Sequence, residues 1–356
     1  MNAWIFWLIV HLTMPTFSAE QIVYGNAQDG TGYLLDANTG AVVDNIAFPF
    51  YPNSIYNTAS PTVLASHHAT AGTDPLGDGI VLLDYDMNVI ANVQWGTFTT
   101  HSFPIDHDAA GNFYIANDRR VYSLDVMVRR YSAAGAQTGE WTLPYRTIAG
   151  MAVSRDGLTL YYAEDSDSVD GTYPDQSPLH RYDLDADAPL SDLIAGGGPS
   201  RWGNQAFMSD AGELFITRAP AHYPDAGFES WEVRRIDTTT GDVLSSYQAP
   251  NPPFDGFDVS IRPDLTDTTA FWMWTEHYGD SDVVTLTKVD IATGAVLRQF
   301  DLDNGTLHGG QTWWVQSTLD TPDEPPPLTE EIIGPLLVIH MRREVPSPQV
   351  PVVEVT

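Results

Sequence analysis

Short apolar runs alternate with polar residues through most of the chain, and turn-forming residues separate them. The clearest case covers residues 150–163, where the run GMAVS meets the turn RDG and a second run, LTLYYA, follows. A period of two, bounded by Asp-Gly turns, is typical of β-strands joined as hairpins. The same order recurs without any helical period, so the pattern predicts an all-β fold.

One hairpin motif returns at a nearly constant spacing. It consists of a strand that ends in Asp, a short turn that often carries Thr-Gly, and a second apolar strand. Clear copies begin at Asp36, Asp237 and Asp290, and looser copies at Asp84, Ser132 and Asp183. The successive spacings are 48, 48, 51, 54 and 53 residues. Two further strand-like runs precede each copy, and four strands per repeat describe one blade of a β-propeller. Six copies predict six blades.

The two ends of the repeat region predict how the ring closes. The first repeat begins at residues 21–24 and lacks its innermost strand, whereas residues 310–316, GQTWWVQ, form a strand without a blade of its own. Pairing this C-terminal strand into blade one would remove the exposed edges of an open sheet. We therefore expect a closed six-bladed β-propeller over residues 20–317.

The segments outside the repeats differ in composition. Residues 3–12, AWIFWLIVHL, have the length of a signal-peptide core and are too short to span a bilayer. We expect residues 1–19 to be a signal peptide and the protein to be exported to the periplasm, the cell surface or the medium; the alternative is a buried first strand. Residues 318–356 hold eight prolines and indicate an extended tail. Its apolar segment 332–341 either pairs with a partner's sheet edge or packs on the propeller.

Charge and composition exclude several classes of function. Lys and Arg number 16 against 47 Asp and Glu, which gives a formal net charge of −31. Such a chain lacks the clustered cations that bind nucleic acid, and it is disfavoured on anionic membranes. No later segment is apolar over about 18 residues, so we expect no membrane span. Cysteine is absent, which excludes disulfides, thiolate metal sites and a cysteine nucleophile.

These motifs resemble the repeats of two groups of known propellers. The Asp-x-x-Thr-Gly hairpins at Asp36, Asp237 and Asp290 resemble the repeats of pyrroloquinoline-quinone and YVTN-type propellers. The run over residues 149–165 is similar to the strand pair of NHL-repeat and gluconolactonase (senescence-marker) propellers. Quinone enzymes usually have eight blades with a Trp that closes each repeat, and this chain departs from both features. The resemblance therefore implies a propeller fold without a quinone cofactor.

The gluconolactonase resemblance also implies a divalent metal, typically calcium, at the axis, held by Asn, Asp and Glu side chains where the inner strands begin. Oxygen ligands suit calcium, whereas His shifts the preference towards a transition metal. Ala149 stands where a ligand is expected, and the family's glutamate in blade one has no counterpart. The side chains at these positions hold a metal, form a polar ligand-binding mouth, or only cap strand ends. The candidates at the mouth are Asn57, His101, Asn204, Asp255 and His308.

Alternating carboxylates suggest a second kind of calcium site. Asp183, Asp185 and Asp187 follow one another at every second position, a spacing that can wrap a calcium ion in a tight loop. Ala188 replaces the glycine that usually follows, and the alternative is a solvated hairpin tip. A Gly-x-Ser-x-Gly motif is absent, so a serine hydrolase has no positive support.

These observations predict an exported β-propeller that acts as a binding or scaffold module. A small molecule or a protein would bind at the axial mouth, and the tail would contact a partner. One alternative is a calcium-dependent, lactonase-like hydrolase with Asp255 as metal ligand or base. Another is a purely structural surface protein. The fold alone does not choose among them, because propellers have many functions.

Overall fold

The structure is a computed structural model, and the regular secondary structure of its described residues is entirely β, as predicted. The chain divides into two units: Ala19–Thr318, which carries all the strands, and a second unit that contains none of the described residues. The predicted signal peptide and tail therefore lie outside the described residues. No helix that could cross a membrane occurs in the described part. The structure describes residues 20–25, 31–48, 52–57, 62–67, 79–84, 88–93, 105–116, 126–144, 148–164, 178–196, 200–220, 232–248, 257–264, 266–277, 284–302 and 312–317.

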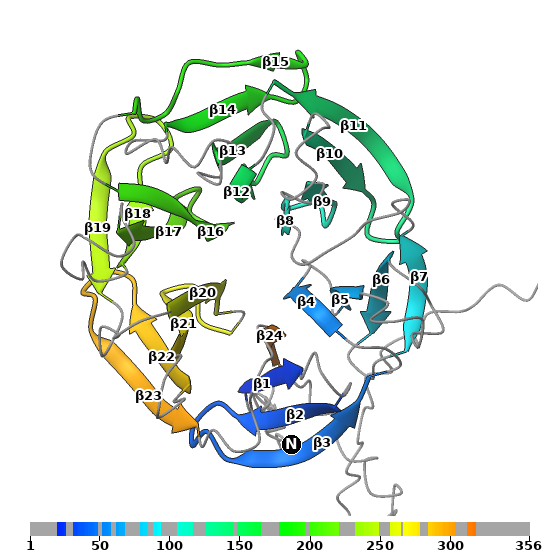
Figure 1. Cartoon of the computed structure of the whole chain (residues 1–356), viewed down its shortest axis with the longest axis vertical. Helices are drawn as coiled ribbons and strands as arrows, with labels where there is room; N and C mark the ends of the chain where they lie inside the picture. The colour runs from blue at the N-terminus through cyan, green and yellow to red at the C-terminus, as the bar shows by residue number, and fades with distance from the viewer. Residues whose placement is uncertain are drawn as a thin grey trace, which may run out of the picture. The chain divides into compact units, whose positions relative to one another are not determined.

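The strands form four-stranded antiparallel sheets arranged around a ring as in a propeller (Figure 1). From the innermost to the outermost strand, sheet 1 is β24 (Thr312–Ser317), β1 (Glu20–Gly25), β2 (Thr31–Asp36) and β3 (Val42–Ala47); sheet 2 is β4 (Pro52–Asn57), β5 (Thr62–His67), β6 (Gly79–Asp84) and β7 (Val89–Val93); sheet 3 is β8 (Ile105–His107), β9 (Phe113–Ala116), β10 (Val126–Tyr131) and β11 (Gln137–Leu143). In the same order, sheet 4 is β12 (Ile148–Val153), β13 (Thr159–Glu164), β14 (Leu179–Asp183) and β15 (Ala188–Pro189); sheet 5 is β16 (Ser200–Met208), β17 (Leu214–Pro220), β18 (Glu232–Ile236) and β19 (Val243–Gln248); sheet 6 is β20 (Phe257–Pro263), β21 (Ala270–His277), β22 (Val284–Asp290) and β23 (Val296–Leu302).

Sheet 1 joins the two ends of the propeller. The last strand, β24, pairs antiparallel with β1, with Glu20 opposite Ser317 and Tyr24 opposite Trp313. This pairing confirms the predicted insertion of the C-terminal strand into the first blade. The contact leaves β1 with a neighbour on both sides, which removes the edge that the first repeat would otherwise expose.

The core consists of apolar clusters between the faces of neighbouring sheets. Between sheets 6 and 1, the fully buried rings of Trp272 and Trp274 pack with Ile22 and Leu35. The third strand of sheet 6, β22, reads VTLTKVD and has six successive buried residues. The outer strands β3, β7, β11, β19 and β23 begin instead with two exposed residues, whereas β15 begins with a partly buried one. The packing of one sheet on the next therefore ends at the rim.

The repeated Asp motif forms the turn between the third and the outer strand, as predicted. Oδ1 of Asp237 accepts hydrogen bonds from the backbone N–H groups of Thr239 and Thr240, at 2.7 and 3.0 Å. Gly241 completes the turn with φ +77°, in the left-handed region that favours glycine. Asp36 caps the corresponding turn of sheet 1 in the same way.

A β-bulge follows the turn in five of the sheets. In sheet 1, Leu35 pairs with Val42 and Leu34 pairs with Asp44, so Val43 has no partner in the ladder. The second residue of the outer strand is bulged in the same way in sheets 2, 3, 5 and 6, at Ile90, Thr138, Leu244 and Leu297. A bulge bends an edge strand and makes it a poorer template for further pairing.

Neighbouring sheets are joined by hydrogen bonds to these turns. Nε1 of Trp141 in β11 donates to the carbonyl of Leu184 at 2.8 Å, and Oη of Tyr247 in β19 donates to that of Ile291 at 2.6 Å. Nη1 of Arg298 in β23 donates to the carbonyl of Ala37 at 3.3 Å. Each acceptor immediately follows the capping Asp of the next sheet. The outer strand of one sheet thus holds the turn of the next.

The turns between inner and second strands lie at the same end of the propeller as the Asp turns. In sheet 5, Oγ1 of Thr238 donates to the carbonyl of Gly212 at 2.9 Å, and in sheet 6 the N–H of Ile291 donates to the carbonyl of Thr269 at 2.8 Å. We call this end of the propeller, where inner strands stop and outer strands start, the hairpin end. The inner hairpins are the turns between inner and second strands.

Candidate functional site

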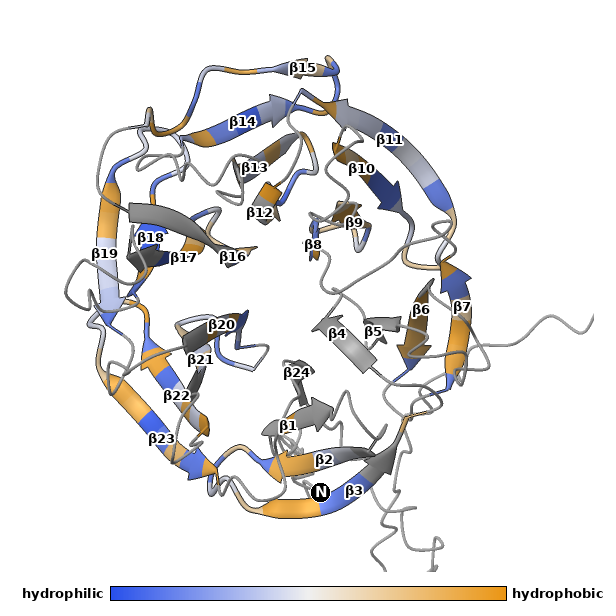
Figure 2. Ribbon diagram, in the orientation of Figure 1, coloured by the Kyte–Doolittle hydropathy of each residue, from blue (hydrophilic) through white to orange (hydrophobic). Residues whose placement is uncertain are grey.

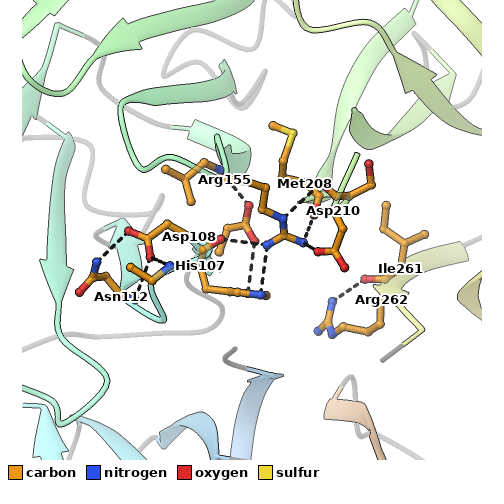
Figure 3. A network of polar contacts seen from close by, with 12 residues as sticks. His107, Asp108, Asn112, Arg155, Met208, Asp210, Ile261 and Arg262 are labelled. Atoms are coloured by element: carbon orange, nitrogen blue, oxygen red, sulfur yellow. Dashed lines mark hydrogen bonds and ion pairs between the residues drawn. The ribbon is translucent and has the colours of Figure 1, made fainter. Parts of the chain in front are cut away.

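A network of polar contacts joins the inner hairpins of neighbouring sheets (Figure 3). Its centre is the guanidinium group of Arg155, in the turn after β12. Nε donates to the carbonyl of Ser209, and Nη1 donates to the carbonyl and to Nε2 of His107, all at 3.2 Å. Nη2 donates to the carbonyl of Met208 and pairs with Oδ1 of Asp210 at 3.1 Å. Arg155 therefore ties sheet 4 to sheets 3 and 5.

These contacts use the whole donor capacity of Arg155. A guanidinium group has five N–H bonds, and the three carbonyls, the imidazole nitrogen and the carboxylate supply five acceptors. The side chain is 17% exposed, so water does not compete freely for them. Arg155 acts as a clamp between turns and has no N–H left for an anionic ligand.

His107 and Asp106, at the end of β8, lie beside this clamp. Because Arg155 donates to Nε2, the ring proton of neutral His107 is on Nδ1. Burial, and then the charge of Arg155, lowers the pKa of His107 to about 4. Burial raises the pKa of Asp106 to about 7, although Arg155 and the Val153 backbone N–H, at 2.8 Å from Oδ2, act in the opposite direction. Nδ1 of His107 and Oδ1 of Asp106 are 3.7 Å apart. As the pH rises, however, the imidazole loses its charge near pH 4, before the carboxyl becomes charged near pH 7.

The first turn of sheet 3 is built around the buried carboxylate of Asp108. Its Oδ1 accepts the backbone N–H groups of Ala110 and Asn112, and its Oδ2 accepts the hydroxyl of Tyr114. Gly157 of the next sheet lies directly against this group: a Cβ there would be 2.8 Å from Oδ2 of Asp108. The turn is therefore fixed from both sheets.

Sheets 5 and 6 are joined by a second arginine. Nη1 of Arg262, in β20, donates to Oε1 of Gln205 in β16 and to the carbonyl of Ile261, both at 2.8 Å. Arg262 is 6% exposed, so both contacts form in a largely dry environment. Like Arg155, it connects inner strands of neighbouring sheets.

The only lysine of the chain, Lys288, is buried below the first turn of sheet 6. Its ammonium group contacts Oδ2 of Asp264 and lies 3.8 Å from Oδ2 of Asp267. It also lies 5.7 Å from the ring centre of Trp272, within the range of a cation–π contact. The buried charge of Asp264 is therefore neutralised within the protein.

A pocket of about 100 Å³ opens among the turns of sheets 3, 4, 5 and 6. Phe207, Pro263, Ala270 and Ile291 provide an apolar lining; the polar lining consists of His107, Arg155, Ser209, Asp210, Asp264 and Thr268. At neutral pH the imidazole is uncharged, and the charges of Arg155 and Asp264 have partners within the protein. The carboxylate of Asp210 pairs with Arg155, but its side chain is 68% exposed, so it can accept further hydrogen bonds. The pocket therefore presents an exposed carboxylate acceptor beside an apolar wall.

The predicted axial mouth stays a prediction, and only some of its residues are described. Asn57 is the last residue of β4 and therefore lies at the hairpin end. Asn204 is in the middle of β16, next to the register shift between Trp202 and Ala206, and Ala149 is the second residue of β12. His101, Asp255 and His308 lie outside the described residues. The calcium-dependent hydrolase thus stays an untested alternative.

The alternating aspartates form the hairpin between β14 and β15. Oδ1 of Asp183 accepts the N–H groups of Asp185 and Ala186, at 2.9 and 2.8 Å. Asp187 has φ +52°, and its carboxylate accepts the hydroxyl of Tyr182 at 2.7 Å. Two of the three carboxylates are thus occupied by their own hairpin. Within the described residues, no group of three or more His, Asp or Glu side chains is placed to hold a metal. Calcium binding stays a prediction.

Sequence reasoning treated the inner hairpins only as turns and missed the network. A signal was present, however. Backbone hydrogen bonds make Ser154 and Ser209 equivalent first residues of their turns, so Arg155 and Asp210 occupy the same position on neighbouring sheets. An alignment of inner hairpins would have placed these opposite charges side by side. The carbonyl groups that accept from Arg155 belong to the backbone, so no residue type in the sequence marks them.

Comparisons with known proteins support the fold alone. A crystal structure of a protein of unknown function from Bacteroides caccae aligns with a TM-score of 0.52 and 11% identity, over 83% of this chain and 98% of that chain. Hydrazine synthase from Kuenenia stuttgartiensis aligns with a TM-score of 0.48 and 14% identity, over 81% of this chain and 80% of that chain. No family model and no curated protein matches the sequence. The resemblance to NHL-repeat and gluconolactonase propellers therefore stays a prediction, and the likeness to the Bacteroides caccae protein concerns the fold alone.

Proposed function

We propose that the protein is an exported six-bladed β-propeller that acts as a binding module, and that the pocket at its hairpin end receives a cationic group of the ligand. The observation that carries this proposal is the exposed carboxylate at the pocket. Each N–H of Arg155 has an acceptor within the protein, and one of these acceptors, the carboxylate of Asp210, is itself largely exposed. An entering group thus meets an acceptor rather than a donor.

The shape and rigidity of the pocket agree with this proposal. A volume of about 100 Å³ suits one side chain or a small amine rather than a large metabolite. Phe207 and Ile291 would cover the aliphatic part of such a group, and Asp210 would pair with its charged end. The turn that carries Asp210 is already held by Arg155, and the Ile291 carbonyl accepts from Tyr247, so binding would need little ordering of the protein.

The test uses methylguanidinium and methylammonium as probes, with acetate as the anionic comparison. Binding is followed by NMR chemical shifts of the protein. We expect both cations to bind in the millimolar range, acetate not to bind, and Asp210→Asn to weaken binding about fivefold, because an exposed charged contact contributes about 1 kcal/mol. Asp185→Asn is the matched control, since it removes one exposed carboxylate from the β14–β15 hairpin and leaves the pocket intact.

A second variant tests the location independently of charge. Thr268 is an exposed residue of the pocket lining, and Thr268→Trp should block the entrance without altering the core. We expect this variant to lose cation binding while it melts like the wild type. Equal effects of Asp210→Asn and Asp185→Asn, or binding of acetate in place of the cations, would refute the cation pocket.

A further inference from the structure

Exposed aliphatic side chains gather at the rim of the hairpin end. Among the described residues, ten large hydrophobic side chains are exposed, and eight of them are the first two residues of β3, β7, β19 and β23. Their exposed fractions lie between 44% and 55%. Sheets 5, 6, 1 and 2, which contain these strands, follow one another around the ring, and Figure 2 shows the hydrophobic segments along that part of the rim. We call these eight residues the aliphatic arc.

The fold does not require aliphatic residues at these positions. Sheet 3 has the same hairpin and the same bulge, yet the first two residues of its outer strand are Gln137 and Thr138. Both are exposed, as in the arc. Since a polar pair is compatible with the same backbone, the four aliphatic pairs expose apolar surface without a structural reason. Exposed apolar surface of this kind is typical of an interaction site.

The arc is surrounded by negative charge. Each of its four pairs follows a turn that begins with Asp, at Asp36, Asp84, Asp237 and Asp290. Hydrogen bonds from the turn lower the pKa of Asp237 and of Asp290, so these carboxylates stay ionised at neutral pH. The whole chain has a formal charge of −31. A complementary surface would present aliphatic side chains together with Lys or Arg.

We infer that the aliphatic arc docks a partner protein whose contact surface combines aliphatic residues with Lys or Arg, one of whose basic side chains enters the pocket. This inference rests on the proposed function, because the pocket and the arc share the hairpin end. A second copy of this chain is a poor occupant, since two chains of −31 repel each other. The bulges also blunt the outer edges, so side chains rather than strand pairing make the contact.

The test replaces the bulged residue of each pair by the threonine that sheet 3 has at Thr138: Val43→Thr, Ile90→Thr, Leu244→Thr and Leu297→Thr. The probes are fluorescent peptides of alternating Lys and Leu, of Lys and Ser, and of Glu and Leu, measured by anisotropy in about 0.15 M NaCl, where long-range attraction is screened. We expect the Lys–Leu peptide to bind the wild type at least about tenfold more tightly than the Lys–Ser peptide, and the Glu–Leu peptide not to bind. The fourfold variant should lose this preference.

The double variant Leu158→Thr, Leu190→Thr is the control, because it removes two exposed leucines of the hairpin end that do not belong to the arc. It should bind the Lys–Leu peptide like the wild type. If the fourfold variant does not fold, Leu244→Thr with Leu297→Thr alone should still reduce binding several-fold. Equal binding of the Lys–Leu and Lys–Ser peptides, or unchanged binding by a folded arc variant, would overturn the inference. Self-association of the wild type that the fourfold variant abolishes would also overturn it, in favour of a second copy.

Failure of the pocket and failure of the arc give different results. Asp210→Asn and Thr268→Trp affect the binding of methylguanidinium, which is too small to reach the rim. The arc variant affects only the preference for leucine in the peptide. If the small cations do not bind but the arc preference is present, the proposed pocket is wrong and the docking surface stands.

Discussion

At the scale of single residues, two arginines, Arg155 and Arg262, connect neighbouring sheets, whereas the capping aspartates act within their own turns. Arg155 uses its five N–H bonds on groups from two neighbouring sheets, and Arg262 joins β20 to β16. The pKa values of His107 and Asp106 follow from this crowding, because both groups are surrounded by residues that are distant in sequence. The local pattern of the sequence cannot predict these partners.

The opposite pKa shifts of Asp106 and His107 predict two pH dependences of the free energy of unfolding that cancel in the wild type. Asp106 has a raised folded-state pKa of about 7, so its contribution to stability is present below pH 4 and is lost as the pH rises towards 7. His107 has a lowered folded-state pKa of about 4, so its contribution is present above pH 6.5 and is lost as the pH falls towards 4. Between pH 4 and 6.5 the two slopes, each about 1.4 kcal/mol per pH unit, cancel.

His107→Gln should uncover the Asp106 slope, because glutamine keeps an acceptor for Arg155 but does not titrate. Relative to the wild type, its free energy of unfolding should fall by about 1 kcal/mol per pH unit between pH 4.5 and 6.5. Asp106→Asn should show the reverse slope. Urea unfolding at pH 4.5, 5.5 and 6.5 measures both. Curves parallel to the wild type in both variants would contradict the assigned shifts.

At the scale of elements, the hairpins were the most predictable part of the protein. Asp36, Asp237 and Asp290 occupy the turns that their motif indicates, because the capping interaction lies within a few residues of sequence. The bulges after these turns were not predicted, since the register depends on how two strands pair.

Two glycines of equivalent turns allow a matched test of contact between sheets. Gly157 and Gly212 both have a positive φ, +72° and +78°, which costs a non-glycine residue about 1–2 kcal/mol. A Cβ at Gly157 would also lie 2.8 Å from Oη of Tyr114 and from Oδ2 of Asp108, whereas a Cβ at Gly212 has no atom within 4 Å.

Gly212→Ala should therefore lower the free energy of unfolding only by the cost of the positive φ. Gly157→Ala should lower it by about 1–3 kcal/mol more, because the added Cβ would overpack the first turn of sheet 3. Chemical denaturation of the two variants gives the difference directly. Equal losses would mean that the first turn of sheet 3 can move away from sheet 4 at no cost, and that the turns are not fixed against each other.

At the scale of the whole molecule, closure was predictable because it leaves a mark in the sequence: a first repeat without its inner strand and a strand after the last repeat. The charge distribution of the pocket was not predictable in this way, because it depends on which donors of Arg155 are already occupied. The fold could thus be predicted from local patterns and from the number of repeats. The site could not, because it depends on contacts between repeats.

Deletion variants test the closure. Removing residues 310–316 should abolish the cooperative thermal transition, because β1 loses its inner neighbour and sheet 1 becomes open. Ending the chain at residue 321 leaves all the described strands in place and should melt like the full chain. Similar losses in the two variants would show that residues after 321 are needed for the fold and that the assigned boundary is wrong.

The pairing of Glu20 with Ser317 makes the propeller nearly circular. The chain enters and leaves the ring at the point where the other sheets have an inner hairpin. A short turn that joined Ser317 to Glu20 would give sheet 1 the connectivity of its neighbours. The strands of the ring would then form one circular chain. The same contacts would then be encoded by a chain opened at any other hairpin. The contacts within the ring therefore do not fix the order of the repeats along the sequence, and circular permutation should leave the architecture unchanged.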